Sequence, residues 1–307
     1  MGENNSVLPI VVLFYPEEKI INRLLHSLAG QVRSICIVDN TPITVKEMIL
    51  SLCDELPFSV HYIELNENKG IAFAQNRGIE YAFAHDFEHV LLLDQDSALP
   101  SNMVSNLLSA ESSLLNEKIL VAAVGPAFQD EKTGEIAAAI VQERLAVNRV
   151  EIDISTFNPI RCDYVIASGS LIRVSLLKQV GVMLEELFID WVDIEWGERC
   201  RHYGYGSYII PSVVMHHSIG DEYVSFLGRK INLHSDFRNY FIVRNAVYLL
   251  RKKTIRWNLK FSFITKIPQY IIFYSFFSKR KVYSFFLLFR AVFDGVVGNM
   301  GEGNRFK

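Results

Sequence analysis

The first third of the chain alternates short apolar runs with amphipathic stretches, and this alternation limits the possible fold more than any other feature. Short apolar runs are typical of buried strands, whereas the stretches between them carry apolar residues at helical spacing. The expected strands are 9–14, 35–38, 59–65 and 89–93, and the expected helices are 17–29, 45–56 and 71–85. Strand and helix in strict alternation predict an α/β fold with a doubly wound, mostly parallel sheet.

From about residue 100 the pattern is less regular. We expect further helices at 101–116 and 174–180, strands at 119–124 and 208–215, an apolar stretch at 164–173 and a polar, aromatic segment at 187–205. In a parallel sheet the polar residues that follow each strand gather along one edge, because right-handed crossovers return every strand in the same direction.

Two carboxylates one residue apart follow the last strand of the regular part. Asp94-Gln95-Asp96 comes directly after the apolar run at 89–93. Open α/β sheets bind ligands at the carboxyl ends of their strands, and carboxylate oxygens are ligands for hard divalent cations. The placement predicts a metal ion that holds a diphosphate, although a solvated Asp-x-Asp turn would account for the same residues.

Composition indicates a globular protein. The chain has 307 residues, 50% of them hydrophobic, and a net charge of -3, so it can bury a sizeable core and is not a disordered chain. Its four cysteines are far apart and show no metal-ligand spacing, and we expect buried, reduced thiols. No charged leader followed by an apolar stretch opens the chain, and we expect a cytoplasmic protein.

An ordered set of motifs over about residues 8–250 resembles the GT-A-fold inverting glycosyltransferases of family 2 type. Among these, the chain is most similar to bacterial rhamnosyltransferases of polysaccharide (O-antigen) biosynthesis. The motifs are Phe14-Tyr15-Pro16, Val38-Asp39-Asn40, the segment Asn66 to Ala72, Asn76-Arg77-Gly78 and Asp94-Gln95-Asp96. The resemblance implies a catalytic domain at 1–250, with a nucleotide-binding half at about 1–100 and an acceptor half at 101–250.

The resemblance also implies roles for single residues. Asp39 would contact the nucleotide base, Asp94 the ribose or the metal, and Asp96 the metal, which would be Mg²⁺ or Mn²⁺. Further residues implied at the nucleotide pocket are Asn68, Gly70 and Asn76, with His217 as a metal ligand and Arg238, Arg244 and Asn245 near the diphosphate. Local explanations compete with each role: a turn at Asp39, a loop into a helix at Gly70, a surface histidine at His217, and solvated cations on a helix around Arg244.

A second acidic cluster supplies candidates for the general base. Inverting sugar transfer needs a carboxylate that takes the proton of the acceptor hydroxyl. In the family the base lies in an acidic motif that ends in Arg, and matching that position to Arg199 implies Asp193 as the base and Glu195 as the second acid. Val192 stands where relatives carry another acid, so Asp190 remains an alternative base, and an acidic helix start would also explain the cluster.

The segment at 251–307 differs from the rest in charge. Residues 251–290 contain ten Lys and Arg, no Asp or Glu, and twelve aromatic residues. The longest uncharged stretch, 267–278, has 12 residues, short of the ~20 that a membrane-spanning helix needs. We expect helices that lie on an anionic membrane surface; aromatic packing on the catalytic domain or on a dimer partner is the alternative.

The resemblance implies an inverting glycosyltransferase that moves a deoxysugar, rhamnose from dTDP-rhamnose, to a lipid-linked saccharide. It would lie peripherally on the inner face of the cell membrane, with no nucleic-acid partner. Two other classes remain open. A nucleotidyltransferase could also use paired carboxylates, but the chain lacks a Gly-rich, Lys-bearing phosphate loop; a non-catalytic membrane-associated scaffold could retain the same fold.

Overall fold

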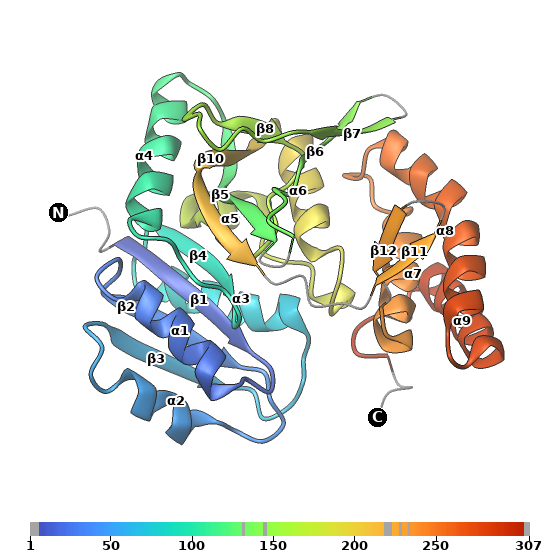
Figure 1. Ribbon diagram of the computed structural model, residues 1–307, viewed down its shortest axis with the longest axis horizontal. Helices are drawn as coiled ribbons and strands as arrows, with labels where there is room; N and C mark the ends of the chain where they lie inside the picture. Colours follow the sequence, from blue (N-terminus) through green and yellow to red (C-terminus); the bar gives the residue numbers. More distant parts are fainter. Residues whose placement is uncertain are drawn as a thin grey trace.

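A computed structural model describes residues 6–130, 133–143, 146–217, 223–226, 229–232 and 234–303. Within these residues the centre is an eight-stranded sheet in the order β3-β2-β1-β4-β9-β5-β10-β8 (Figure 1). Its strands are β1 (Val7–Leu13), β2 (Ser34–Asp39), β3 (Ser59–Glu64), β4 (His89–Asp94), β5 (Val121–Asp130), β8 (Ile160–Cys162), β9 (Ser170–Arg173) and β10 (Gly206–His217). Only β8 and β9 pair antiparallel with their described neighbours, which confirms the expected mostly parallel α/β sheet.

Helices connect the parallel strands as the alternation predicts. They are α1 (Glu18–Leu28), α2 (Lys46–Cys53), α3 (Ile71–Ala84), α4 (Met103–Asn116), α5 (Val174–Val180) and α6 (Val192–His202), with the 3₁₀ turn η2 (Glu185–Leu187) before α6. Two hairpins stand apart from the sheet: β6 (Ala139–Glu143) with β7 (Ala146–Val150), and β11 (Tyr223–Phe226) with β12 (Arg229–Asn232). Neither hairpin was expected from the sequence.

The apolar stretch at 164–173 is mostly not a strand. Only its last four residues form β9, which inserts between β4 and β5 and runs against both. Gly169, at φ +81°, turns the chain into β9, and the polypeptide before this turn lies near the carboxyl end of β4, since Gly169 N donates to Leu92 O at 2.7 Å. This insertion directs residues 164–168 toward the edge where the strands end.

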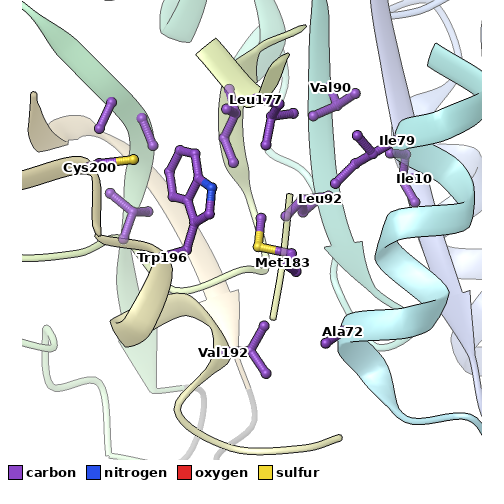
Figure 2. Close-up of a cluster of buried hydrophobic side chains, with 14 of the residues drawn as sticks. Ile10, Ala72, Ile79, Val90, Leu92, Leu177, Met183, Val192, Trp196 and Cys200 are labelled. Carbon is purple, nitrogen blue, oxygen red and sulfur yellow. The ribbon is translucent and has the colours of Figure 1, made fainter. Parts of the chain in front are cut away.

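The core occupies both faces of the sheet. Alternate residues of β1 face opposite sides, as the two-residue period of a strand requires: Leu8 and Ile10 join one cluster, Val7 and Val11 the other. Figure 2 shows the first cluster, in which the indole of Trp196 lies among side chains of the sheet and of the surrounding helices. The cysteines Cys36, Cys53, Cys162 and Cys200 are buried and unpaired, as expected.

Three helices complete the chain at one end of the molecule (orange to red in Figure 1): α7 (Asp236–Leu249), α8 (Trp257–Phe277) and α9 (Lys281–Val297). They pack on one another around Tyr240, Phe241, Ile271 and Leu288. In the part of the chain that the structure describes, no helix combines the length and the apolar character needed to cross a bilayer.

Candidate active site

The carboxyl ends of β1, β2 and β4 meet at one edge of the sheet. In the strand registers Leu13 is paired with Asp39, and Val12 is paired with Asp94. Asp39 and Asp94 therefore lie on either side of the end of β1. The sheet brings these two predicted residues together because their strands are neighbours of the same strand in a parallel arrangement.

Gln95 fixes the turn that follows β4. Its side-chain oxygen accepts a hydrogen bond from Phe14 N at 2.8 Å, and its amide nitrogen donates to Phe14 O at 3.2 Å. The turn closes when Ser97 N donates to Asp94 O at 3.1 Å. Asp94 and Asp96, both half-buried, are thus presented from a backbone that is hydrogen-bonded to the neighbouring strand.

Asp39 is almost fully buried, with 1% of its surface exposed. Its carboxylate accepts hydrogen bonds from Thr41 N at 3.1 Å, Val45 N at 3.1 Å, Thr44 Oγ1 at 3.2 Å and Tyr62 Oη at 2.8 Å. Its role in organising the turn after β2 is therefore evident. Within the described residues Oδ1 accepts one hydrogen bond, from Thr41 N, which leaves an acceptor position for the predicted contact with a base.

A ladder of amides links the turn after β2 to the start of α3. Asn68 Oδ1 accepts from Asn40 Nδ2 and from Gly70 N, both at 3.0 Å. Gly70 has φ +85°, and a Cβ there would lie 2.5 Å from Phe188 O. A side chain at position 70 would therefore collide with the backbone of Phe188. The same Phe188 O also accepts a hydrogen bond from Ile71 N at 2.8 Å.

Asn76 faces the same segment of the chain rather than the cleft. Its amide nitrogen donates to Met183 O at 2.9 Å and to Glu185 Oε1 at 2.8 Å, and its oxygen accepts from Met183 N at 2.9 Å. Both amide hydrogens are thus already donated within the protein. Asn76 thereby positions the segment that leads into residues 188–191, and its predicted contact with the nucleotide stays a prediction.

Residues 188–191 form a conformationally strained loop. Phe188, Asp190 and Trp191 have φ of +65°, +61° and +65°, a region that costs a non-glycine residue roughly 1 kcal/mol or more and that concentrates at functional sites. The Asp190 carboxylate accepts from Arg238 Nε at 3.1 Å, and Trp191 Nε1 donates to Ile242 O at 3.0 Å. Two contacts to α7 therefore hold this loop in place.

Asp193 follows the loop in the first turn of α6. Burial raises the pKa of its carboxyl to about 6, and the nearby charges of Asp94 and Asp190 add to the rise, against a hydrogen bond from Ile194 N that lowers it. A carboxylate with a pKa close to neutral is suited to accept a proton from a hydroxyl group. The two predicted acidic clusters are thus electrostatically coupled across one site.

A cleft of about 560 Å³ joins these elements. Asp94, Asp190, Asp193 and Arg238 supply its charged side chains, and the rest of its wall is formed by Ile71, Gln75, Tyr164, Ile166, Ala167, Ser168, Ile189, Trp191, Val192, Ile194 and Ile242. The sequence analysis did not assign residues 164–168 to the site. The turn Ser168-Gly169-Ser170 was the available signal, since such a turn interrupts an apolar run.

Glu195 and Arg199, two residues of the second acidic motif, form an internal ion pair. Arg199 donates to both oxygens of Glu195, at 3.1 and 2.7 Å, and to the carbonyl oxygens of Val180 and Val182. Glu195 is 3% exposed. This pair therefore braces α6 against the segment after α5, which leaves Asp193 and Asp190 as the acids of the motif that line the cleft.

Arg244 is not among the residues that line the cleft, and its predicted place beside the diphosphate stays a prediction. It is fully buried, stacks on Phe241 with 4.5 Å from its guanidinium carbon to the ring centre, and donates to Gly301 O, Leu187 O and Glu186 O. Its neighbour Asn245 donates to Leu187 O, Ile189 O and Asp190 O. The Arg-Asn pair supports the strained loop from behind.

The predicted metal site is only partly covered by the described residues. The backbone of His217 ends β10, but its side chain, like Gly220, lies outside the described residues. Among the residues that were described, no group of three or more His, Cys, Asp or Glu side chains is arranged to hold a metal ion. The carboxylates of Asp94 and Asp96 nevertheless offer the oxygen donors that Mg²⁺ and Mn²⁺ prefer.

Known proteins resemble this chain in sequence. Residues 10–180 match the family described as Glycosyl transferase family 2. The dTDP-rhamnosyl transferase RfbF of Shigella flexneri is 34% identical over 254 residues, which make up 82% of this chain and 82% of RfbF. The family match includes the strand ends that bear Asp39 and Asp94.

Solved structures at 14% identity share the fold alone. The mannosyltransferase PcManGT from Pyrobaculum calidifontis, in complex with GDP-Man and Mn²⁺, has a TM-score of 0.58 over 96% of this chain and 76% of its own. TarS 1-349 of S. aureus has a TM-score of 0.56, over 94% and 80%. GalNAc-T7 with UDP, GalNAc and Mn²⁺ also has a TM-score of 0.56, and the match covers 87% of this chain and 55% of the GalNAc-T7 chain.

Proposed function

Because the chain belongs to glycosyl transferase family 2, we propose that it is a rhamnosyltransferase that uses dTDP-rhamnose and transfers the sugar with inversion to a lipid-linked saccharide. The observation on which this rests is the cleft in which Asp193, with its raised pKa, faces the strand end that bears Asp94. The identity with the dTDP-rhamnosyl transferase RfbF supports the donor, and a role in polysaccharide synthesis agrees with the same relative.

We assign the donor to the carboxyl ends of β1, β2 and β4. Asp39 would accept a hydrogen bond from the pyrimidine ring, and Asn68 would shape the pocket through its bonds to Asn40 and Gly70. Asp94 and Asp96, and His217 at the end of β10, would hold Mg²⁺ or Mn²⁺. The oxygen donors of the turn fit such a cation, which when bound offsets negative charge on the departing diphosphate.

We assign the proton transfer to Asp193. The acceptor hydroxyl would donate its proton to the Asp193 carboxylate as its oxygen forms the new glycosidic bond and the bond from the sugar to the nucleoside diphosphate breaks. Asp190 is less suited to this role because its carboxylate already pairs with Arg238 at 3.1 Å. A base with a pKa of about 6 is ionised at neutral pH and still accepts a proton readily.

The decisive experiment is a panel of nucleotide sugars measured by thermal shift with and without Mn²⁺. We expect dTDP-rhamnose with Mn²⁺ to raise the melting temperature more than UDP-glucose or GDP-mannose does. Product analysis with a lipid-linked saccharide should then yield free dTDP. Release of pyrophosphate instead would indicate a nucleotidyltransferase, and no shift with any nucleotide sugar would support a non-catalytic scaffold.

We also propose that the enzyme acts in the cytoplasm at the inner face of the membrane, to which α8 and α9 attach it. Their buried faces pack on α7, so part of the aromatic content serves internal packing. Their outer faces leave large apolar side chains exposed, among them Trp257 at 69%, Ile272 at 68% and Phe286 at 67%. Such a surface beside exposed cations such as Lys279, Arg280 and Lys281 fits an anionic interface, to which each engaged cation contributes ~1 kcal/mol.

Vesicle flotation tests this attachment. Charge reversal of Lys279, Arg280 and Lys281 to Glu should release the protein from vesicles that contain phosphatidylglycerol and spare transfer to a short soluble acceptor. The matched control reverses three exposed cations of the other half: Lys19, Arg33 and Lys118. Equal retention of both triple variants would assign the exposed face to an oligomer interface instead.

A further inference from the structure

A second cavity lies beside the catalytic cleft, between α6, α7 and α8. It has a volume of about 380 Å³, and most of its wall is apolar, with Trp191, Ile194, Ile242, Leu259, Phe263 and Ile267 as its main contributors. We call it the α8 pocket. Protein interiors are close-packed, and voids larger than a water molecule are few. A space of this size falls instead in the range of ~300–1,000 Å³ typical of ligand sites.

The α8 pocket adjoins the catalytic cleft through shared walls. Tyr164, Trp191, Ile194 and Ile242 line both spaces. The indole of Trp191 separates them: its nitrogen bonds to Ile242 O, and its ring meets that of Phe263 edge-on at 4.7 Å. Because Trp191 directly follows Asp190 in the strained loop, a molecule that enters the pocket lies against the wall of the acceptor site.

Two cations line the α8 pocket, Arg256 and Lys266, and they differ in whether a carboxylate neutralises them. Arg256 lines the pocket but is matched internally, by Asp163 at 2.7 Å and by Glu198, which accepts from its guanidinium. Lys266 also lines the pocket and is exposed to solvent. Over the described parts of the chain no ion pair involves Lys266, so its ammonium group is available to an anionic group at the pocket mouth.

We propose that the α8 pocket binds the hydrocarbon chain of the lipid-linked acceptor, with the phosphate of that lipid at Lys266. The proposal rests on the proposed function and adds to it a binding site for the lipid part of the acceptor. An apolar wall suits a hydrocarbon chain, and the shared Trp191 wall brings the attached saccharide into the cleft at Asp193. One wall of the pocket is α8, whose outer face we have assigned to the membrane, so the pocket lies next to the surface from which the lipid would enter.

Farnesyl diphosphate is the probe, because it combines a branched hydrocarbon chain with a diphosphate. Its binding is measured by calorimetry in EDTA, so that no divalent cation recruits the diphosphate to Asp94 and Asp96. We expect farnesyl diphosphate to bind at least tenfold more tightly than inorganic diphosphate and more tightly than farnesol. Equal affinity for inorganic diphosphate would overturn the assignment of the pocket to a hydrocarbon chain.

Two positions of α8 that are three residues apart give a matched pair of variants. Ser262 lines the pocket, whereas Thr265 is exposed and does not. Ser262→Trp should fill the pocket and weaken farnesyl diphosphate binding at least tenfold, and Thr265→Trp should leave it within twofold. If both variants bind as the parent does, the chain does not occupy the α8 pocket and the proposal fails.

A second pair tests the headgroup site without altering the core. Lys266→Ala should weaken farnesyl diphosphate binding about fivefold and leave farnesol binding unchanged, while Lys260→Ala, on the same helix, should change neither. Equal effects of the two lysine variants would remove the headgroup from Lys266. Donor binding, measured with dTDP-rhamnose and Mn²⁺ for the parent protein and for each variant, separates the two hypotheses. If the parent protein does not bind the donor, the proposed function is refuted. If it binds the donor but not farnesyl diphosphate, the pocket proposal alone is refuted.

Discussion

The two acidic groups of the cleft are held in different ways. Asp94 and Asp96 follow a central strand, and their turn is fixed by Gln95 to the strand next to it. Asp190 and Asp193 lie in and after a strained loop, which is held by hydrogen bonds from residues about fifty positions further along the chain. The first group is placed by the sheet itself, and the second depends on the docking of α7.

This difference has a physical consequence. A turn at the end of a buried strand is stable when the sheet is stable, so its carboxylates can serve in binding without being needed to hold the turn. A loop with three non-glycine residues at positive φ persists only when its surroundings compensate for the strain. We therefore expect substitutions in the first group to affect binding alone, and substitutions behind the second to affect both stability and turnover.

The largest effect should come from the base. Asp193→Asn should retain donor binding and lower turnover roughly a hundredfold or more, because an amide cannot accept the acceptor proton. Asp190→Asn is the matched control and should be milder, since its partner is Arg238. Steady-state kinetics with dTDP-rhamnose measure both variants. A reversed order would make Asp190 the base and show that the alignment through Arg199 is displaced.

The next largest effect concerns the support behind the loop. Arg244→Ala should lower the free energy of unfolding by about 3 kcal/mol, because the carbonyl groups of Leu187 and Gly301 lose a charged, buried donor. Donor affinity in the folded variant should stay within twofold. Arg238→Ala, at the exposed end of the same helix, should cost less than about 1 kcal/mol. Chemical denaturation measures the free energy of unfolding of both variants, and calorimetry measures their donor affinity. A selective loss of donor affinity in Arg244→Ala would indicate that Arg244 contacts the diphosphate.

The first acidic group should respond in the opposite manner. Asp96→Ala should weaken Mn²⁺-dependent donor binding at least tenfold and change the free energy of unfolding by less than about 0.5 kcal/mol, as expected at a surface site. Asp54→Ala, an exposed carboxylate remote from the cleft, is the control. Calorimetry in Mn²⁺ and in EDTA gives the metal-dependent part. Unchanged affinity in Mn²⁺ would remove Asp96 from the metal site.

The contrast between the two groups also explains what the sequence could predict. Apolar alternation predicted β1 to β4 and α1 to α3, and hence that Asp39 and Asp94 lie along one edge of the sheet, because right-handed crossovers return parallel strands in the same direction. The place of Arg244 could not be derived in this way. Its partners near residues 187 and 301 are set by tertiary packing, and an Arg-Asn pair on a helix has the same sequence whether it faces a ligand or a loop.

The smallest expected effect is the dependence of stability on the ionisation of Asp193. Its pKa in the folded protein is raised to about 6 from an ordinary value of 3.8, so folding favours the protonated form. The stability from this group is therefore fully present below the unfolded pKa and is lost as pH rises through the folded pKa. The shift corresponds to at most about 3 kcal/mol, and we expect about 1 kcal/mol because the residue is partly open to the cleft. Metal-free Asp193→Asn should accordingly equal the parent protein at pH 3, below the unfolded pKa, and be more stable by about that amount at pH 7.5. Denaturant unfolding at both pH values measures the difference, and a gain that is the same at both would trace it to packing rather than to charge.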